Sequence, residues 1–338
     1  MYQNVYKYDE MKRSEHMAVR KTVGWYYWTH QLLEVTGKDA AAFLDKMFAN
    51  PISNLKVGRD RYTTMLNEKA EIIDDVVVLR LAEDKFWAST LFVKKMIAWF
   101  DAHRGSEEVA YENVTKKWDM YAVQGPRSKD LVNALAENPV DDQKFFSIAD
   151  NVIDGIPVKI NRGGFTGEKL GYEIYVSPEQ GEAIEEKLRE KGKAFDAKEV
   201  TDFQIMAISL PTEAGFYYMR DLMYTNPFEV GLDRGIGWDK EFIGKEALEK
   251  IREEGPAREM LGFTVEKADV HIQHKGFGGP GDAVLLNGEK VGRVSKFTYS
   301  FVKDINIGYI LADKGVLKTG DHVSIHGFDA VIADKPFI

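Results

Sequence analysis

Along the first third of the chain, hydrophobic and polar positions change between helical and strand-like spacing. Residues 9–23 have helical spacing, and the run GWYYWTHQLLEV, residues 24–35, is strand-like. Helical spacing returns over residues 37–50, and a proline follows, which favours a helix end there. Residues 61–90 show the alternation of three strands separated by turns, and residues 93–105 have the pattern of an amphipathic helix. This order of elements predicts an α+β unit.

A second pass of the same pattern occupies the middle of the chain. Residues 118–137 predict a strand that runs into a helix through Gly125 and Pro126. Residues 154–176 predict further strands, and residues 178–192 predict another helix. Two similar strand-and-helix units in succession predict a pseudo-repeated body made of two α+β subdomains.

The hydrophobic pattern changes after a charged helical segment at residues 244–259, which contains a Gly-Pro pair that favours a helix end. Short strand patterns dominate from there on, and an Asn-Gly pair at residues 287–288 lies between two of them as a type I′ hairpin turn. Such a segment is typical of a small all-β barrel or sandwich. We therefore expect two domains, an α+β body over residues 1–255 and a β domain over residues 256–338.

The composition excludes several classes of protein. The 338 residues are 44% hydrophobic and 29% charged, which is enough chain for more than one core. The net charge is −9 and no basic block carries interleaved aromatics, so we expect no nucleic-acid partner. No uncharged apolar run approaches the ~18 residues of a membrane span, and the N-terminus lacks an apolar signal segment. We expect no membrane contact and a cytoplasmic location.

The chain contains no cysteine, which excludes disulfides, thiolate metal sites and cysteine nucleophiles, so any catalysis must use oxygen and nitrogen groups. The run GFGGPG at residues 276–281 has the spacing of a dinucleotide fingerprint, but a strand follows it where that fingerprint requires a helix. His271 and His274 share a loop without a third ligand at metal spacing. We expect neither a dinucleotide site nor a metal site.

Two adjacent carboxylates, Asp74 and Asp75, stand before a run of valines that predicts a buried strand. Side chains alternate between the faces of a strand, so one aspartate must point toward whatever the strand covers. An unpaired buried charge is costly, and the partner is either internal, as in a turn capped by Asp74, or a ligand. Glu173 is a second acid on a predicted strand, either exposed or facing a ligand.

Aromatic residues gather in two segments, Trp25 to Trp28 and residues 215–224. Such residues commonly belong to the core. Adjacent residues on a strand face opposite sides, however, so not all of them can be buried on one side. Some of these aromatics can therefore line a pocket.

Seven motifs occur in chain order: HMAVRKTVG, YTTMLNEKAEIIDDVVV, AVQGPRS, GGFTGEKLGYEIYV, TNPFEVGL, DKEFIGKEAL and NGEKVGRVSKFTYS. This series resembles the aminomethyltransferase family, whose type member is the glycine-cleavage T-protein. The resemblance implies an α+β fold of three subdomains in a cloverleaf around a central site for tetrahydrofolate, the last subdomain being a C-terminal β-barrel. It also implies an enzyme, a folate-dependent transferase with tetrahydrofolate as its cofactor.

The resemblance assigns expected roles to four residues of the folate site. Asp75 matches the acid that meets the folate, and Tyr62 matches the tyrosine beside it. Glu173 matches the glutamate that reads the pterin ring, and Phe165 is included among the folate-binding residues. A pterin presents an amine and a ring N–H side by side, and one carboxylate can accept both hydrogen bonds. Asp75 would lie near N5 and N10, where one-carbon transfer moves a proton and develops positive charge.

Several positions depart from the family pattern on the donor side. The family's FDVSHM is YYWTHQ in this chain, and the arginine of its R-L-E-A-G motif is absent from SLPTEAGF. A tryptophan expected after the glycine-leucine pair of NPFEVGL is Arg234. We expect the donor pocket to contain Tyr27, His30, Gln31, Tyr217 and Arg234.

These departures favour a demethylase that moves a methyl group from a small methylated donor, such as a methoxy-aromatic compound, to N5 of tetrahydrofolate. The first alternative is a glycine-cleavage aminomethyltransferase that makes 5,10-methylene-tetrahydrofolate. The second is a non-catalytic folate-binding module, and the third is a chain that has lost folate binding with the missing arginine. The expected partners are tetrahydrofolate, a small-molecule donor, and a carrier or corrinoid protein if one delivers the carbon.

Overall fold

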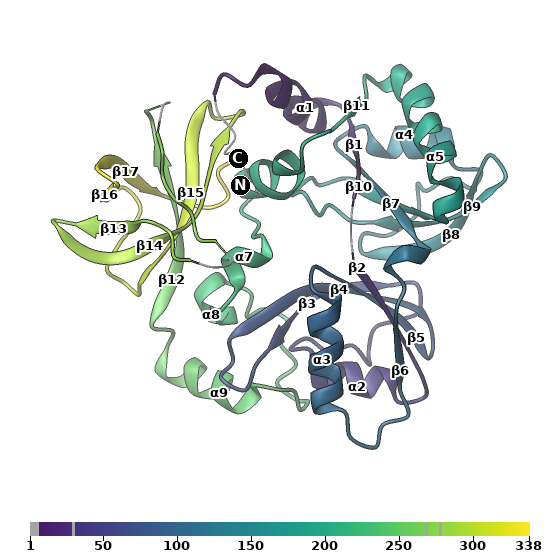
Figure 1. Ribbon diagram of the computed structural model, residues 1–338, viewed down its shortest axis with the longest axis horizontal. Coiled ribbons are helices and arrows are strands. Elements are labelled where there is room, and N and C mark those ends of the chain that lie inside the picture. The colour runs from purple at the N-terminus through teal and green to yellow at the C-terminus, as the bar shows by residue number, and fades with distance from the viewer. Residues whose placement is uncertain (1–6, 29–30, 268–269, 277–278) are drawn as a thin grey trace.

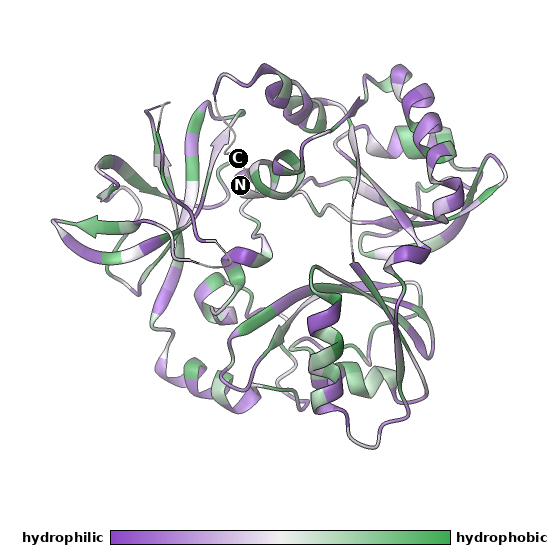
Figure 2. Cartoon of the chain, in the orientation of Figure 1, coloured by the Kyte–Doolittle hydropathy of each residue, from purple (hydrophilic) through white to green (hydrophobic). Residues whose placement is uncertain are grey.

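The computed structural model describes residues 7–28, 31–267, 270–276 and 279–338. The chain forms three lobes, each built on its own sheet, and the lobes surround the middle of the molecule (Figure 1). Hydrophobic residues are concentrated on the strands, whereas the outer helices and the loops carry many hydrophilic residues (Figure 2). The predicted α+β fold with a cloverleaf arrangement is confirmed.

The first lobe is an antiparallel five-stranded sheet with helices on one face. Its strands, in spatial order, are β3 (Asp60–Leu66), β4 (Ile72–Ala82), β5 (Lys85–Thr90), β2 (Gln31–Thr36) and β6 (Ala110–Asn113). The helices are α2 (Ala40–Met47) and α3 (Val93–His103). Along β4, Val76 and Val78 pack with these helices, whereas Val77 and Leu79 point to the opposite face. The three strands predicted over residues 61–90 are confirmed.

The second lobe is a six-stranded sheet that also has helices on one face. Its strands, in spatial order, are β11 (Lys198–Glu199), β1 (Gly24–Tyr27), β7 (Asp119–Gln124), β10 (Gly171–Val176), β9 (Ile156–Arg162) and β8 (Ser147–Ile153). The helices α4 (Ser128–Leu135) and α5 (Pro178–Gly192) share a hydrophobic core with this sheet. The opposite face joins Met120 and Tyr175 to Leu79 and Trp87 of the first lobe.

The strand-like run at residues 24–35, predicted as a single element, is divided in the structure. It forms two strands in two different sheets, because β1 pairs with β7 whereas β2 pairs with β5 and β6. The chain therefore crosses from one lobe to the other at this point. The two α+β subdomains are interleaved, and each sheet contains segments from distant parts of the sequence.

The third lobe is a closed six-stranded barrel, which decides between the predicted barrel and sandwich. Its strands, in spatial order, are β12 (Arg258–Val265), β15 (Ile305–Asp313), β14 (Glu289–Ser300), β13 (Ala283–Leu286), β16 (His322–Ile325) and β17 (Phe328–Ala333), which pairs again with β12. Asn287 and Gly288 both have positive φ, 52° and 87°, as the predicted type I′ turn requires. The division of the chain at residue 255 stays a prediction.

Short helical segments connect the three lobes. They are α1 (Glu10–Lys21), η1 (Thr115–Lys117), η2 (Lys193–Phe195), η3 (Ile205–Ser209), α6 (Leu210–Glu213), α7 (Met219–Leu222), α8 (Pro227–Val230) and α9 (Lys245–Glu254). The segment η3 is a π-helical turn that runs directly into α6, and all five of its residues are buried. None of the helices described is long and apolar enough to cross a membrane.

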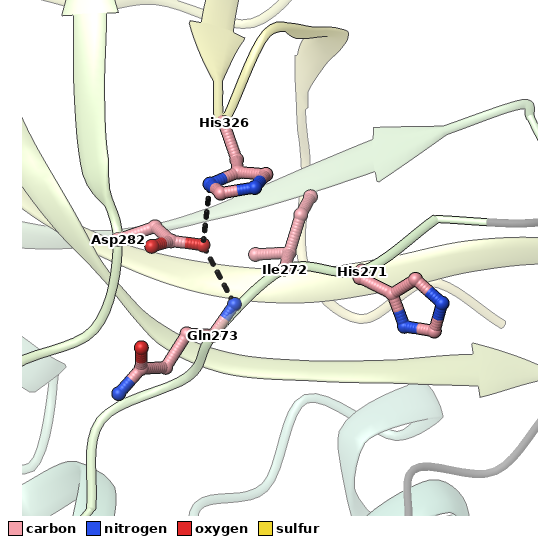
Figure 3. Close-up of a pocket in the computed structure, with 5 residues that line it drawn as sticks. All are labelled: His271, Ile272, Gln273, Asp282 and His326. Atoms are coloured by element: carbon pink, nitrogen blue, oxygen red, sulfur yellow. Dashed lines mark hydrogen bonds and ion pairs between the residues drawn. The ribbon is translucent and has the colours of Figure 1, made fainter.

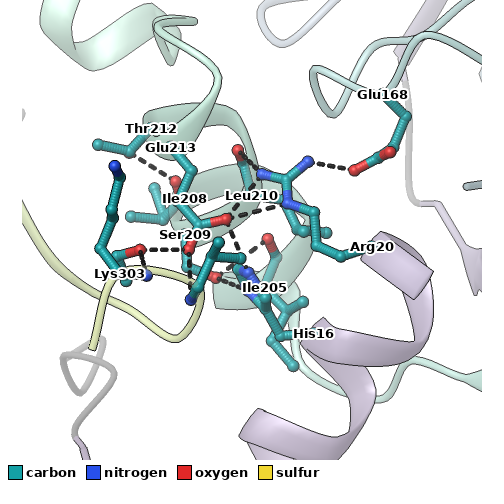
Figure 4. Close-up of polar contacts among 12 residues, drawn as sticks. His16, Arg20, Glu168, Ile205, Ile208, Ser209, Leu210, Thr212, Glu213 and Lys303 are labelled. Atoms are coloured by element: carbon teal, nitrogen blue, oxygen red, sulfur yellow. Dashed lines mark hydrogen bonds and ion pairs between the residues drawn. The ribbon is translucent and has the colours of Figure 1, made fainter. Parts of the chain in front are cut away.

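A buried carboxylate, Glu213, ties these connecting segments to the barrel (Figure 4). Its Oε2 atom lies 2.9 Å from Nε2 of His16 and accepts hydrogen bonds from Nε and Nη2 of Arg20. Its Oε1 atom accepts from the hydroxyl of Ser300 at 2.6 Å. Arg20 also pairs with Glu168 of the second lobe. One side chain thus links α1, α6 and β14, and through Arg20 the second lobe.

Glu213→Gln should destabilise the fold in a pH-dependent way. Burial alone would raise the pKa of Glu213, but His16 and Arg20 lower it from 4.5 to about 2. The carboxylate therefore contributes stability above about pH 4.5, and this contribution is lost as the pH falls toward 2. We expect a loss of about 3 kcal/mol at pH 7, because removing one partner leaves buried charges unpaired.

The measurement is urea unfolding of both proteins at pH 7 and near pH 3, with the exposed Glu186→Gln in α5 as the matched control. The difference between wild type and Glu213→Gln should shrink at the lower pH. A constant difference would show that the charge of Glu213 does not carry the effect.

Candidate active site

The adjacent acids Asp74 and Asp75 point to opposite faces of β4. Asp74 faces the helix-covered side, is 1% exposed and accepts a hydrogen bond from the Thr90 hydroxyl. Asp75 pairs in register with Thr64 on β3 and points to the side where the first two lobes meet. The sequence did not decide between an internal partner and a ligand, and Asp74 has an internal partner, Thr90. Asp75 is the acid directed toward the middle of the molecule.

The hydroxyl of Tyr62 donates a hydrogen bond to Oδ2 of Asp75 at 2.9 Å. Tyr62 lies opposite Val77 in the β3–β4 register, so its side chain shares the face of Asp75. Burial raises the pKa of Asp75 to about 6, and the hydrogen bond from Tyr62 opposes that rise. The structure therefore brings these two predicted residues together. Tyr62 holds the carboxyl group of Asp75, whose charge changes with pH around its pKa of about 6.

Glu173 occupies the corresponding face of the second sheet. Its Oε2 atom accepts hydrogen bonds from Tyr175, at 2.9 Å, and from the amide of Asn161, at 3.2 Å. Asn161 is directly opposite Glu173 in the β9–β10 register, which explains why both side chains share one face. Burial raises the pKa of Glu173 to about 7, and the two hydrogen bonds oppose that rise. The fold thus fixes this acid on a rigid strand.

Asp60 is a third acid of this region that the sequence analysis missed. It is 5% exposed, and neither carboxylate oxygen has a hydrogen-bond partner among the residues described. Asn161 lies close enough to lower the pKa of Asp60, although its amide does not have the geometry of a hydrogen bond to the carboxylate. Burial and then the charge of Glu173 raise the pKa of Asp60 to about 8. The available signal was its spacing, since Asp60 stands two residues before Tyr62 on one strand and shares its face.

A basic group from the barrel approaches Asp75 from another side, and the sequence analysis missed it too. Lys296 of β14 forms an ion pair of 2.7 Å with Asp221 of α7, and both side chains are fully buried. The charges of Asp221 and Lys296 both act on the pKa of Asp75, in opposite directions. A lysine inside the apolar run VSKFTYS was the available signal, because a buried lysine requires a partner.

The remaining expected residues are distributed unevenly. Tyr217 lies close enough to Tyr62 to contribute to the raised pKa of that tyrosine, and its hydroxyl accepts a hydrogen bond from Lys335. The ring of Phe165 lies 6.0 Å from that of Phe146, whose carbonyl accepts from the backbone N–H of Asp60. Phe165 is therefore near the acidic end of the site.

Other expected donor residues are not brought to this face. The side-chain oxygen of Gln31 accepts from the backbone N–H of Val93 at the start of α3. Tyr27 is 42% exposed and donates a hydrogen bond to Asp119. Arg234 is exposed on the loop after α8, and His30 lies outside the described residues. The neighbours of Tyr27, Tyr26 and Trp28, pack in the seam between the lobes.

A shallow hollow on the barrel contains a second polar group (Figure 3). Oδ2 of Asp282 accepts from the backbone N–H of Gln273 at 2.7 Å and lies 3.8 Å from Nδ1 of His326. Within the part of the chain that the structure describes, no three His, Asp or Glu side chains gather closely enough to hold a metal ion. The hollow therefore gives no support for a metal centre.

Comparison with known proteins agrees with the geometry over nearly the whole chain. Residues 1–240 match the family described as the GCVT N-terminal domain. The chain is 32% identical to an aminomethyltransferase from Halalkalibacterium halodurans over 326 residues, which cover 93% of this chain and 85% of that protein. It is also 32% identical to an aminomethyltransferase from Thermoanaerobacter sp. over 330 residues, which cover 96% of this chain and 86% of that protein.

Among solved structures, the glycine cleavage system aminomethyltransferase T from Bartonella henselae has the same fold. The TM-score is 0.83 at 22% identity, and the match covers 97% of this chain and 89% of that one. The sequence matches cover nearly the whole chain and establish the relationship, and the structural match shows that the fold is shared. The chain therefore belongs to the aminomethyltransferase family and is a tetrahydrofolate-dependent transferase.

Proposed function

We propose that the protein transfers a one-carbon unit to tetrahydrofolate as the aminomethyl group of a carrier-bound donor and forms 5,10-methylene-tetrahydrofolate. The observation that carries this proposal is the Tyr62–Asp75 pair at the centre of a chain whose relatives are aminomethyltransferases over nearly their whole length. The demethylase function expected from the sequence receives less support. Two residues that favoured it, Gln31 and Tyr27, make their hydrogen bonds away from the proposed site.

Asp75 is the proposed catalytic residue. Tetrahydrofolate bound beside Asp75 would supply N5 and N10 as acceptors of the one-carbon unit, in steps that release the donor's sulfur and ammonia. Positive charge develops on nitrogen, and protons move during these steps. A carboxylate held in place by Tyr62 can stabilise that charge and accept a proton, and its fixed position avoids reorganisation during the reaction.

Glu173 is the residue that we propose to recognise the pterin ring through hydrogen bonds. Its Oε2 atom already accepts from Tyr175 and Asn161, which hold the carboxylate in one orientation. A carboxylate accepts several hydrogen bonds, so the pterin amine and ring N–H can add to those already present. Asp60 and Phe165 lie on the same side and would enclose the ring.

Incubation with tetrahydrofolate and an aminomethyl-lipoyl carrier protein should yield 5,10-methylene-tetrahydrofolate. Mass spectrometry of the folate distinguishes this product from 5-methyl-tetrahydrofolate, which contains two more hydrogens. A parallel reaction replaces the carrier by a pool of methoxy-aromatic, sulfonium and betaine donors. Formation of 5-methyl-tetrahydrofolate there, without product from the carrier, would contradict the proposal and restore methyl transfer.

Asp75→Asn should lower kcat by about 100-fold or more, because the amide can neither accept the proton nor stabilise the charge. Folate affinity should stay within a few-fold of wild type. In the wild type, kcat should rise with pH through about 6 as the carboxyl ionises, and the variant should lack that limb. The exposed Asp84→Asn is the control. A variant with near-normal turnover would exclude the assigned role.

Glu173→Gln should weaken tetrahydrofolate binding by about tenfold or more, since charge-assisted hydrogen bonds are replaced by an amide with mismatched donors. Isothermal titration at neutral pH measures the affinity, and a thermal melt checks that the variant folds. The exposed Glu182→Gln serves as the matched control. Unchanged affinity in a folded Glu173→Gln protein would place the pterin elsewhere.

A further inference from the structure

Arg220 of α7 is a buried cation without a carboxylate. Its side chain is 7% exposed, and its Nε and Nη2 atoms have no hydrogen-bond partner among the residues described. Its guanidinium makes a cation–π contact, 5.9 Å from the ring centre of Tyr218. A buried cation in this state costs free energy, so Arg220 calls for a partner that the described residues do not supply.

The nearest acid in sequence, Asp221, is already neutralised. Its Oδ2 atom lies 2.7 Å from Nζ of Lys296 and accepts from the backbone N–H of Tyr218. Its Oδ1 atom accepts from the hydroxyl of Ser295 at 3.2 Å. Both oxygens of Asp221 are therefore engaged, which leaves the charge of Arg220 uncompensated.

The other side chains around Arg220 add positive charge and a second unpaired group. Lys275 donates to the backbone carbonyl of Met223 at 2.6 Å. Burial and the charges of Arg258 and Arg220 lower its pKa, and Asp221 opposes that change. Nδ1 of His274 is buried without a hydrogen-bond partner in the described structure. Burial and then the charge of Arg220 lower the pKa of His274 to about 4, so the ring stays neutral beside the guanidinium.

This basic group, defined as Arg220, His274, Lys275 and Lys296, is adjacent to the reaction centre. The charge of Lys296 acts on Asp75, and that of Arg220 acts on Lys296. Tyr218, beneath Arg220, lies 6.0 Å from the ring of Phe203, which lies 5.8 Å from Trp28. Arg220 thus borders the aromatic side chains of the seam, and Lys296 connects it electrostatically to Asp75.

We propose that Arg220 binds a carboxylate of a ligand that lies beside Asp75. Guanidinium groups bind carboxylates through two parallel hydrogen bonds, and the two unpaired nitrogens, Nε and Nη2, form such a fork. The Nδ1 atom of His274, which has no hydrogen-bond partner among the described residues, offers a further polar contact. The proposal depends on the proposed function only in taking Asp75 as the reaction centre.

The carboxylate has two sources with the same chemistry. It belongs either to the glutamate tail of tetrahydrofolate or to a small free donor that carries an acid group. In the second case the carboxylate of the donor must be free, not used to attach the donor to a carrier protein. Binding experiments with paired probes separate the two sources.

The test is isothermal titration of the full chain with two pairs of ligands, each with and without a carboxylate. The first pair is tetrahydrofolate and 6-methyltetrahydropterin, and the second is 4-methoxybenzoate and 4-methoxybenzamide. Wild type, Arg220→Gln and Arg220→Lys are compared, with Arg104→Gln at an exposed position as the control. Turnover is not measured, so a failure of the proposed aminomethyl transfer does not decide the result.

Arg220→Gln should lose at least tenfold in affinity for one carboxylate probe and keep its affinity for the matching uncharged probe, with Arg220→Lys intermediate. Loss for tetrahydrofolate assigns the glutamate tail, and loss for methoxybenzoate assigns an acidic donor. The ligand-free variant should melt at or above the wild-type temperature, because an unpaired buried charge is removed. The proposal would be overturned if wild type and Arg220→Gln bound the probes with equal affinity, or if wild type bound neither carboxylate probe. It would also be overturned if Arg220→Gln melted at a lower temperature without any change in binding.

Discussion

The site depends on the packing of two sheets through the faces that their own helices leave uncovered. Leu79 and Trp87 from the first sheet meet Met120 and Tyr175 from the second, with the rings of Trp87 and Tyr175 5.6 Å apart. This seam removes water from every carboxyl group that points into it. Burial is accordingly the largest cause of the raised pKa of Asp60, Asp75 and Glu173.

The seam also explains why the candidate acids are well fixed. Asp75 shares its strand face with Val77 and Leu79, so the residues that pack the lobes together also orient the carboxylate. Tyr175 contributes in the same way, since its ring packs against Trp87 while its hydroxyl holds Glu173. Side chains on packed strands have little freedom to rearrange, which is the condition for a preorganised site.

The sequence predicted the elements better than their pairing. Period-2 alternation identified β3, β4 and β5, and the Asn-Gly pair at residues 287–288 identified the hairpin. Alternation also required one of two aspartates to leave the helix-covered face, but it could not say which, because that depends on where α2 and α3 pack. The split of residues 24–35 between two sheets depends on long-range pairing that no local pattern contains.

The same limit applies to the site. Tyr62, Asp75 and Glu173 could be named through motifs, whereas Lys296 and Asp221 could not be paired in advance, since one lies in the barrel and the other in a connecting helix. The expected roles of Gln31 and Tyr27 came from the segment YYWTHQ, which departs from a family motif on the donor side. The face of the strand on which each residue lies decides where its side chain points. Gln31 accepts a hydrogen bond from the start of α3, and Tyr27 donates one to Asp119.

The distribution of charge gives the site a direction. Asp60 and Glu173 are neighbouring acids on one side, Arg220 is a cation whose described neighbours leave it without a carboxylate, and the ion pair of Lys296 with Asp221 acts on the charge of Asp75. A ligand with hydrogen-bond donors at one end and a carboxylate at the other would be bound in a single orientation, because reversal would place like charges together. The Tyr62–Asp75 pair would then always meet the same atoms of that ligand. Orientation and catalysis would therefore follow from one arrangement of strands.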